Sequence, residues 1–242
     1  VLRIRVINSK TALDKIAVKY TIVHVGPEFQ VPTTTTLNAS GELSITLNEN
    51  LPYQQVWLYI ENYVNTVLVV NEDLTLTINA GQKEISFWSK ELKLEGTDCL
   101  LNEQLLKHIC FNKSQRSALT RELTDVCMGA AMNQLPVHDM QTKADLIYTE
   151  MKKRDAAFLA QSPGFAWAIE SETKAEYYEW LLKAYWNKPT PDSVQQQFIN
   201  FRPYLTTNSS TQFFRNLKDY YTIKNFSKID AARENLFADT AG

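Results

Sequence analysis

The fold is decided at the point where the chain reads LEGTDCLL, residues 94–101. Before this point apolar and polar residues alternate, as in LRIRV at residues 2–6, which is the period of a half-buried β-strand. After it, apolar residues recur every three or four positions, which is the period of an amphipathic helix. Asp98 is a suitable N-cap for the first helix. We therefore expect an α+β fold with two domains, residues 1–97 and residues 98–242.

The first domain is predicted to be an antiparallel β-sandwich. Its runs of β-branched and aromatic residues are short, and Asn, Asp, Gly and Pro residues separate them at the spacing typical of such sandwiches. The four threonines at residues 33–36 are expected to lie in a loop. The predicted strands are residues 2–6, 17–25, 43–47, 56–60, 67–70, 74–78 and 85–88.

The second domain is predicted to be an all-helical array of about six segments. Two amphipathic stripes are clear, one over residues 119–130, which Pro136 ends, and one over residues 140–158. Further helices are expected over residues 162–186, 192–201, 211–226 and 228–237. We expect the first helix to pack firmly on the sheet through Leu100, Leu101 and Leu105, rather than to follow a flexible hinge.

The composition excludes several classes of function. The 242 residues include 25 Lys and Arg against 27 Asp and Glu, a formal net charge of −2. This balance argues against an extended phosphate backbone as a partner, so we expect no nucleic-acid binding. The seven glycines contain no Gly-x-Gly spacing, which excludes the common phosphate-binding loops. No apolar run approaches the about 18–20 residues that a transmembrane helix needs, so we expect no transmembrane segment.

The side chains that most often carry catalysis are scattered along the chain. The three histidines are His24, His108 and His138. No two of them have the spacing of a metal site, and no nucleophile elbow of the Gly-x-Ser-x-Gly type is present. The carboxylate pairs Glu170/Glu172 and Glu176/Glu179 fit the solvated face of a helix. We therefore expect no enzyme activity, with no catalytic residue, no metal and no cofactor.

The cysteines give no redox motif. Cys99, Cys110 and Cys127 form no Cys-x-x-Cys, and we expect three small buried thiols. Cys99 and Cys110 are predicted to share one helix at a separation of about 16 Å, which is too far for a disulfide.

Aromatic residues are concentrated in one stretch of the helical half. Eleven of the chain's 27 aromatic residues lie between residues 158 and 204. The helix predicted there carries an apolar arc of more than half its circumference, so it must be covered on more than one side. Neighbouring helices could cover it, or a protein partner, a second copy of the chain in a homodimer, or a bound peptide. The candidate partner-binding residues are Trp167, Tyr178, Trp180, Tyr185 and Trp186.

Three short motifs follow one another in an order that is found in a known family. They are SGELS at residues 40–44, VLVVNEDLTL at residues 67–76, and LEG at residues 94–96 followed by Asn102. In this order they resemble the N-terminal, non-catalytic region of thioredoxin-like thiol-disulfide oxidoreductases that Gram-negative gut bacteria export to the cell envelope. In that family a β-sandwich, a helical region and a thioredoxin domain follow one another.

The resemblance implies an accessory role. This chain contains no Cys-x-x-Cys, and NED at residues 71–73 stands where the family more often has a Pro-Gly pair. None of the family's redox residues can therefore be assigned here. The implied function is a non-enzymatic interaction module, located in the periplasm or cell envelope, whose partner is a protein or a catalytic thioredoxin domain absent from this chain.

Two other functions stay open from the sequence. The first is a stand-alone envelope protein that binds a glycan or a peptide through surface aromatic residues, with Trp167, Trp180 or Trp186 as a stacking platform. The second is a hydrolase whose site is assembled from scattered residues. A hydrolase predicts that one histidine lies within hydrogen-bond distance of a carboxylate or a hydroxyl.

Overall fold

The computed structural model describes residues 1–25, 30–47, 51–61, 63–81, 92–186 and 188–222. The strand predicted at residues 85–88 and the helix predicted at residues 228–237 lie outside these ranges.

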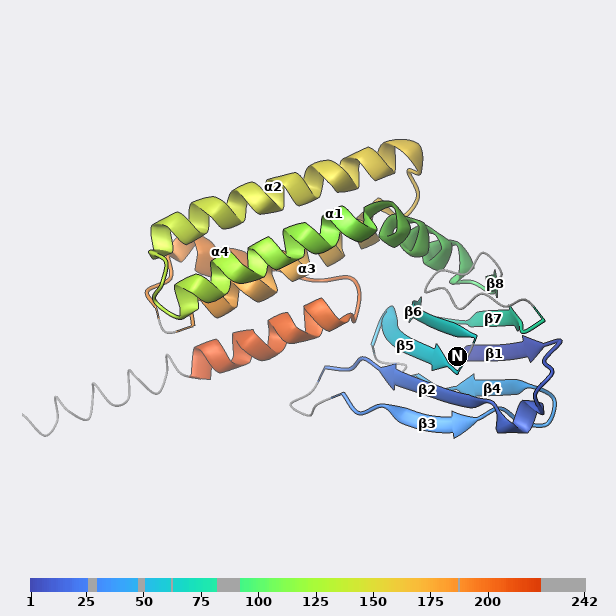
Figure 1. Ribbon diagram of the computed structural model, residues 1–242. Coiled ribbons are helices and arrows are strands. Elements are labelled where there is room, and N and C mark those ends of the chain that lie inside the picture. The colour runs from blue at the N-terminus through green and yellow to red at the C-terminus, as the bar shows by residue number, and fades with distance from the viewer. Residues whose placement is uncertain (26–29, 48–50, 62, 82–91, 187, 223–242) are drawn as a thin grey trace, which may run out of the picture.

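A β-sandwich forms the first domain, as predicted (Figure 1). Within the described residues, one sheet has the strand order β4-β1-β7-β8 and the other the order β3-β2-β5-β6. Buried residues alternate with exposed or half-buried ones along β1, β5 and β7, so each sheet turns one face inward. The strands are β1 (Leu2–Ile7), β2 (Ala17–Ile22), β3 (Thr33–Thr36), β4 (Glu42–Ile45), β5 (Gln54–Ile60), β6 (Val64–Val70), β7 (Leu74–Asn79) and β8 (Leu92–Glu95).

Two details of the sandwich differ from the sequence prediction. β1 pairs with β7 in parallel, with Leu2 opposite Leu74, whereas we expected antiparallel pairing throughout. The four threonines predicted to lie in a loop form β3, which pairs with β2 at the edge of its sheet. Threonine is β-branched and suits a half-exposed strand, so strand propensity outweighed the polar character of the run.

The second domain is helical, as predicted. It contains α1 (Cys99–Ala131), α2 (Val137–Gln161), α3 (Ala166–Ala184), α4 (Asp192–Asn200) and a further helix from residue 208 to residue 222. In Figure 1, α1, α2 and α3 pack side by side, and the helix of residues 208–222 lies next to α3. α3 begins later than the predicted start at Pro163, because Ser162 ends α2 and Phe165 adopts a left-handed backbone with φ 51°.

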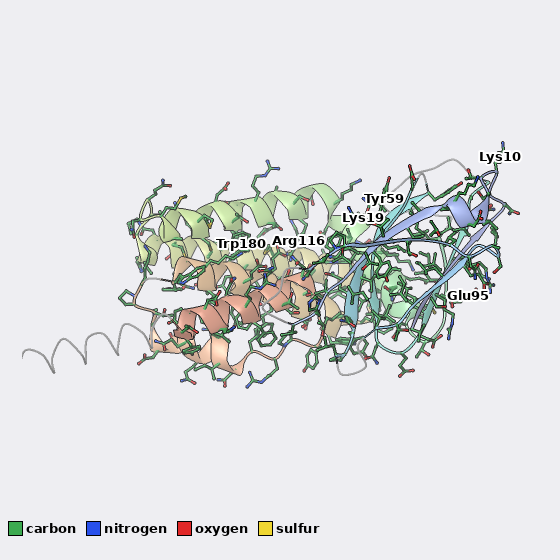
Figure 2. The ribbon with its side chains drawn as sticks, turned by 90° about the horizontal axis from the view of Figure 1, so that it is seen from below. Lys10, Lys19, Tyr59, Glu95, Arg116 and Trp180 are labelled. Atoms are coloured by element: carbon green, nitrogen blue, oxygen red, sulfur yellow. The ribbon has the colours of Figure 1, made fainter. Side chains whose placement is uncertain are left out.

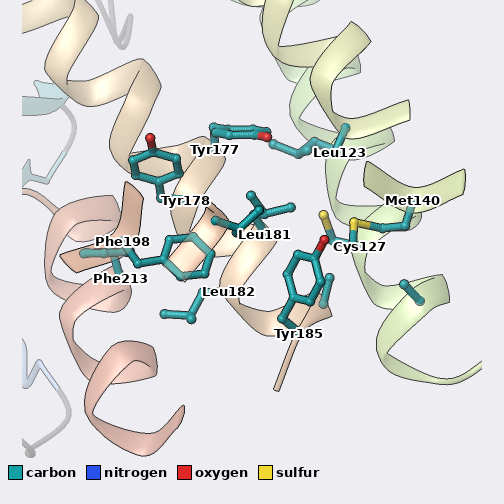
Figure 3. Packing of buried hydrophobic residues seen from close by; sticks show 14 of the residues in the cluster. Leu123, Cys127, Met140, Tyr177, Tyr178, Leu181, Leu182, Tyr185, Phe198 and Phe213 are labelled. Carbon is teal, nitrogen blue, oxygen red and sulfur yellow. The ribbon is translucent and has the colours of Figure 1, made fainter. Parts of the chain in front are cut away.

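The core of the helical domain is rich in aromatic and sulfur-containing side chains. Both predicted stripes face it, with Leu123, Cys127 and Ala130 from α1 and Met140 and Met151 from α2 among the buried residues. Figure 3 shows how α3 supplies the centre of this cluster between α1 and α2 on one side and the last two helices on the other.

The start of α1 is hydrogen-bonded to the sandwich. Asp98 does not cap α1 with its side chain, in contrast to the prediction. Its Oδ2 instead accepts the backbone N–H groups of Asn71 and Glu72, both at 2.9 Å, in the turn between β6 and β7. One helical turn later the Asn102 amide accepts the Val69 N–H at 2.8 Å and donates to the Val69 carbonyl at 2.7 Å. We refer to Asp98 and Asn102 as the junction pair.

Apolar packing supports the junction pair. A small cluster of buried residues joins the two domains, with Val69 from β6, Leu101 from α1, Ala168 from α3 and Leu205 from the segment after α4. The expectation that α1 packs firmly on the sheet is therefore confirmed, although Leu100 itself is exposed.

Replacing Asn102 by Ala is expected to lower the free energy of unfolding by about 2–3 kcal/mol, because the buried Val69 N–H and carbonyl both lose their partner. Urea unfolding followed by circular dichroism measures this change. The matched control is Asn200→Ala, at an exposed helical asparagine, which should change the free energy by less than about 0.5 kcal/mol. Equal effects of the two substitutions would contradict the role given to Asn102.

Gly96 occupies a position that only glycine fits well. Its φ is +107°, and a Cβ atom there would lie 2.7 Å from Asp73 Oδ2 and 2.8 Å from the Asp73 carbonyl oxygen. Gly96→Ala is therefore expected to destabilise the protein by about 2 kcal/mol. The control is Gly129 inside α1, where an added Cβ atom would lie 3.7 Å from its nearest neighbour, so Gly129→Ala should stabilise by about 0.5–1 kcal/mol. Thermal melts of both variants test the opposite signs.

Candidate functional site

A cleft of about 640 Å³ opens between the two domains. Its sandwich wall is the outer face of β5 and β6, where Gln55 and Trp57 stand opposite Val69 and Val67. These residues alternate with buried ones such as Val56 and Leu68, so the strand period turns them away from the sandwich core. The helical wall comes from α1, α3 and the segment after α4, with the apolar residues Leu105, Ile109, Ile169 and Leu205.

The cleft is closed at one end and open at the other. Val69 and Leu205 belong both to the cleft wall and to the buried cluster that joins the domains, so the walls meet there. Farther along β5 the surface is open, since Trp57 is 40% exposed and Tyr59 is 44% exposed. In Figure 2, Tyr59 and Lys19 lie on the side of the sandwich toward the helices, and Arg116 lies on the helical side.

The helical wall also carries a group of polar side chains that bond to one another. His108 Nε2 lies 2.8 Å from Asp155 Oδ1, and Asp155 Oδ2 accepts a hydrogen bond from Thr173 Oγ1 at 2.6 Å. Arg116 donates to Glu176 Oε2 at 2.6 Å and to Thr173 Oγ1 at 3.2 Å. This chain of bonds joins α1, α2 and α3 and holds a cation and two carboxylates at fixed positions, with Arg116 and Glu176 in the lining of the cleft.

Glu172 is the most perturbed acid of the cleft. Burial, aided by the nearby Glu176 carboxylate, raises the pKa of its carboxyl from an ordinary value of 4.5 to about 7. Thr207 Oγ1 donates to Glu172 Oε2 at 2.5 Å, which lowers the pKa and partly offsets the burial. Thr207 follows Thr206, whose carbonyl accepts the Gln55 N–H of β5 at 2.9 Å. Glu172 is thus linked through one short segment to the opposite wall.

The expectation that the carboxylates of α3 are solvated is wrong for three of them. Glu172 lies in the cleft wall, Glu176 pairs with the half-buried Arg116, and Glu179 is 7% exposed. Burial raises the pKa of Glu179, while Lys183 Nζ at 2.8 Å from its Oε1 lowers it. The second domain packs helices on both sides of α3, so a face that is polar in sequence is enclosed rather than exposed.

The predicted aromatic site does not form one surface. Tyr178 and Tyr185 are buried, with Tyr178 packed against Phe198 and Phe201 and Tyr185 directed toward Cys127 and Met140 (Figure 3). They belong to the core and cannot contact a partner, as the alternative of coverage by neighbouring helices predicted.

The other three predicted residues lie apart from one another and outside the cleft. The Trp167 ring lies 5.0 Å from that of Tyr53 and 5.9 Å from that of Tyr204. Lys183 Nζ lies 4.0 Å from the centre of the Trp180 ring, and Trp186 is 37% exposed near the end of α3. Trp57 lines the cleft but is not among the predicted partner-binding residues. A lone tryptophan on the polar face of a strand is a sequence signal that could have indicated a binding surface there.

The histidine condition set for a hydrolase is met, because His108, in the wall of the cleft, lies 2.8 Å from the Asp155 carboxylate. Within the described residues the His108 ring has no hydroxyl or thiol as a hydrogen-bond partner, since its Nε2 lies 2.8 Å from Asp155 Oδ1 and 2.9 Å from Asn112 Nδ2. An acyl-transfer site needs such a nucleophile next to the histidine. His24 and His138 lie far from this group in sequence, the first just after β2 and the second in the first turn of α2.

The cysteines are free, and they differ in exposure. Cys127 is buried, which raises the pKa of its thiol to about 12, and Cys99 is partly buried. Cys110 is exposed, which corrects the prediction of three buried thiols. All three lie on α1, so Cys99 and Cys110 share one helix as predicted.

Comparisons with known proteins identify no relative. No protein-family model matches the chain, and neither the curated proteins nor the solved structures include a significant match. Across the described residues, no group of three or more His, Cys, Asp or Glu side chains could hold a metal ion. Among the helices of the described part of the chain, none has the length and apolar character needed to cross a membrane.

The raised pKa of Glu172 predicts a specific dependence of stability on pH. A carboxyl with a higher pKa in the folded state stabilises that state below its unfolded pKa, and the contribution is lost as the pH rises through about 7. The Glu172→Gln variant does not titrate there, so it should gain about 2–3 kcal/mol relative to the wild type between pH 5 and pH 8. Urea unfolding of both proteins at each pH gives the difference. A difference that is constant across this range would show that Glu172 titrates normally.

Proposed function

We propose that this protein is a non-catalytic binding module that holds a polypeptide segment of a protein partner in the cleft between its two domains. The observation that carries the proposal is the cleft itself. It has apolar walls from both domains and a fixed polar group at one side, and its volume of about 640 Å³ lies within the range of ligand sites, roughly 300–1,000 Å³.

A protein partner suits the lining of the cleft. Trp57 offers a large, partly exposed ring beside Val67, and such aromatic residues are common anchors of protein interfaces. Ile109 and Leu105 face them from α1. Arg116 and Glu176 hold each other at 2.6 Å, so a ligand is not required to neutralise either charge. These features favour a mostly apolar ligand with some polar groups over a strongly charged one.

A non-catalytic role is supported by the way the polar group is arranged. The carboxylate of Asp155 is 3% exposed and is shared between His108 and Thr173, which are parts of three packed helices. Such a network rigidifies the wall of the cleft, and its Thr173 hydroxyl donates to Asp155 rather than to His108, which is not the arrangement of a hydroxyl nucleophile activated by a histidine.

The resemblance in sequence extends the proposal to the cellular setting. It favours an accessory module of an envelope thioredoxin-like oxidoreductase, with the catalytic domain supplied outside these residues. Sequencing the parent gene beyond the codon for Gly242 tests this part. A following segment with Cys-x-x-Cys would support it, and an immediate stop codon would favour a stand-alone peptide-binding protein.

Peptide binding is expected to depend on Trp57. A phage-displayed library of random 12-residue peptides is panned against the full chain, and the most enriched sequence is synthesised with a fluorescein label. Trp57→Ala should weaken its binding at least about tenfold in fluorescence anisotropy, because the largest side chain of the sandwich wall is lost.

Tyr59→Ala is the matched control for this experiment. Tyr59 lies two residues farther along the same face of β5, is similarly exposed, and does not line the cleft, so its removal should change the affinity less than about twofold. The proposal fails if no sequence is enriched over an unrelated immobilised protein, or if the bound peptide is insensitive to Trp57→Ala. Cleavage of the peptide, seen by mass spectrometry, would refute the non-catalytic part.

A further inference from the structure

The outer edge of β6 is covered by the chain at one point. Val69 directs both its N–H and its carbonyl away from β5 and toward the Asn102 side chain. In an antiparallel pair, every second residue of a strand points its backbone groups the same way. Val67 and Asn65, two and four residues before Val69 in β6, therefore also direct their backbone groups outward.

Other hydrogen bonds agree with this assignment. Gln55 lies opposite Val69 in the ladder, and its backbone groups bond to Val23 and to Thr206 rather than to β6. Gln55 and Val69 are thus a pair without mutual hydrogen bonds. By alternation, Trp57 and Val67 form the next pair of this kind.

The outward backbone groups of Asn65 and Val67 have no main-chain or side-chain partner among the described residues. Asn65 is exposed and Val67 is half-buried. They offer two N–H donors and two carbonyl acceptors at the spacing that an antiparallel strand requires. Unpaired groups of this kind are a template for another strand.

The free edge adjoins the cleft. Val67 belongs to both, since its backbone lies on the edge and its side chain lines the sandwich wall. A strand added at this edge would send every second side chain to the face of the sheet on which Trp57 stands, and therefore into the cleft. Those side chains would meet Leu105 and Ile109 of α1 on the other side.

We infer that the partner segment binds as an extended β-strand on the edge of β6 at Asn65 and Val67, with alternate apolar side chains inserted into the interdomain cleft. This inference rests on the proposed function, and it specifies the conformation of the ligand and the strand edge on which the ligand docks. The Asn102 amide shows the pairing within the chain itself, because it bonds to Val69 as the backbone of a neighbouring strand would.

The short length of the open edge favours a single segment of a partner over a second copy of the chain. α1 covers β6 from Val69 onward through Asn102, which leaves two outward positions within the described part of β6. The apolar cleft beside them supplies the additional surface that such a short ladder needs.

The decisive variant is Asn65→Pro. Proline removes the outward N–H and places its ring where the added strand would lie, yet an outward position on an edge strand tolerates proline in the folded protein. Binding of the fluorescein-labelled peptide selected by panning should fall at least about tenfold. Asn65→Ala, which changes only the side chain, should change the affinity less than about twofold.

A second proline variant controls for general effects on the sheet. Thr34 lies on β3, the opposite edge of the same sheet. Leu37, three residues farther along the chain, donates its N–H inward to the Ile16 carbonyl at 3.3 Å, so by alternation the N–H of Thr34 points outward. Thr34→Pro should leave the affinity unchanged within about twofold, since this edge does not adjoin the cleft. Thermal melts confirm that each variant is folded before binding is measured.

Hydrogen exchange of the wild-type protein tests the same inference without a substitution. The amide protons of Asn65 and Val67 should exchange at least about tenfold more slowly when the peptide is bound, and those of Thr34 and Thr36 should not change. Unchanged exchange at Asn65 and Val67, or wild-type affinity in a folded Asn65→Pro variant, overturns the strand docking.

The outcomes separate this inference from the proposed function. If Trp57→Ala weakens binding of the peptide but Asn65→Pro does not, the cleft binds peptides in a conformation other than an added strand. If neither substitution weakens binding, both the proposed function and this inference are overturned. A dimer in analytical ultracentrifugation that Asn65→Pro dissociates would assign the edge to a second copy of the chain and overturn the inference.

Discussion

The relation between the two domains depends on the two buried side chains at the start of α1. Asp98 and Asn102 bond to four backbone groups of the sandwich, two on the buried Val69 and two in the exposed turn at Asn71 and Glu72. Leaving the two buried Val69 groups unpaired costs more than their bonds contribute, so alternative docking angles of α1 are disfavoured. The helical domain therefore stands at one angle to the sheet, and every wall of the cleft has its position because of this contact.

The cleft forms because the surfaces of α1 and of the sandwich diverge from the point where the junction pair holds them together. Near Leu101 the helix and the sheet are in contact, and toward Arg116 they are separate enough to leave a cavity. A hydrogen-bonded network within the helical wall keeps that wall rigid, while Thr206 and Thr207 connect α3 to β5. The site thus lies between rigid elements, as expected for a preformed binding site.

Periodicity in the sequence predicted the fold class and most elements. The two-residue period of strands and the helical period of about 3.6 residues are local properties of the chain. What it could not predict was the surface that each element would meet. Tyr178 and Tyr185 looked like a binding face because a helical wheel does not show which chain covers it. Glu172 and Glu176 looked solvated for the same reason, since the outer face of β5 that helps to enclose them belongs to the other domain. Asp98 illustrates a third limit, because a residue suited to cap a helix can bond to a distant turn instead.

The Asn102 amide has a further consequence for the sandwich on its own. In the whole protein it occupies, at Val69, part of an edge strand that no other residue in the described part of the first domain pairs with. Removing the helices would extend the exposed edge by Val69 and uncover the apolar outer face of β5 and β6, a combination that promotes self-association into aggregates. The helical half therefore shields part of the sandwich, and we expect the isolated first domain to aggregate more readily than the whole chain.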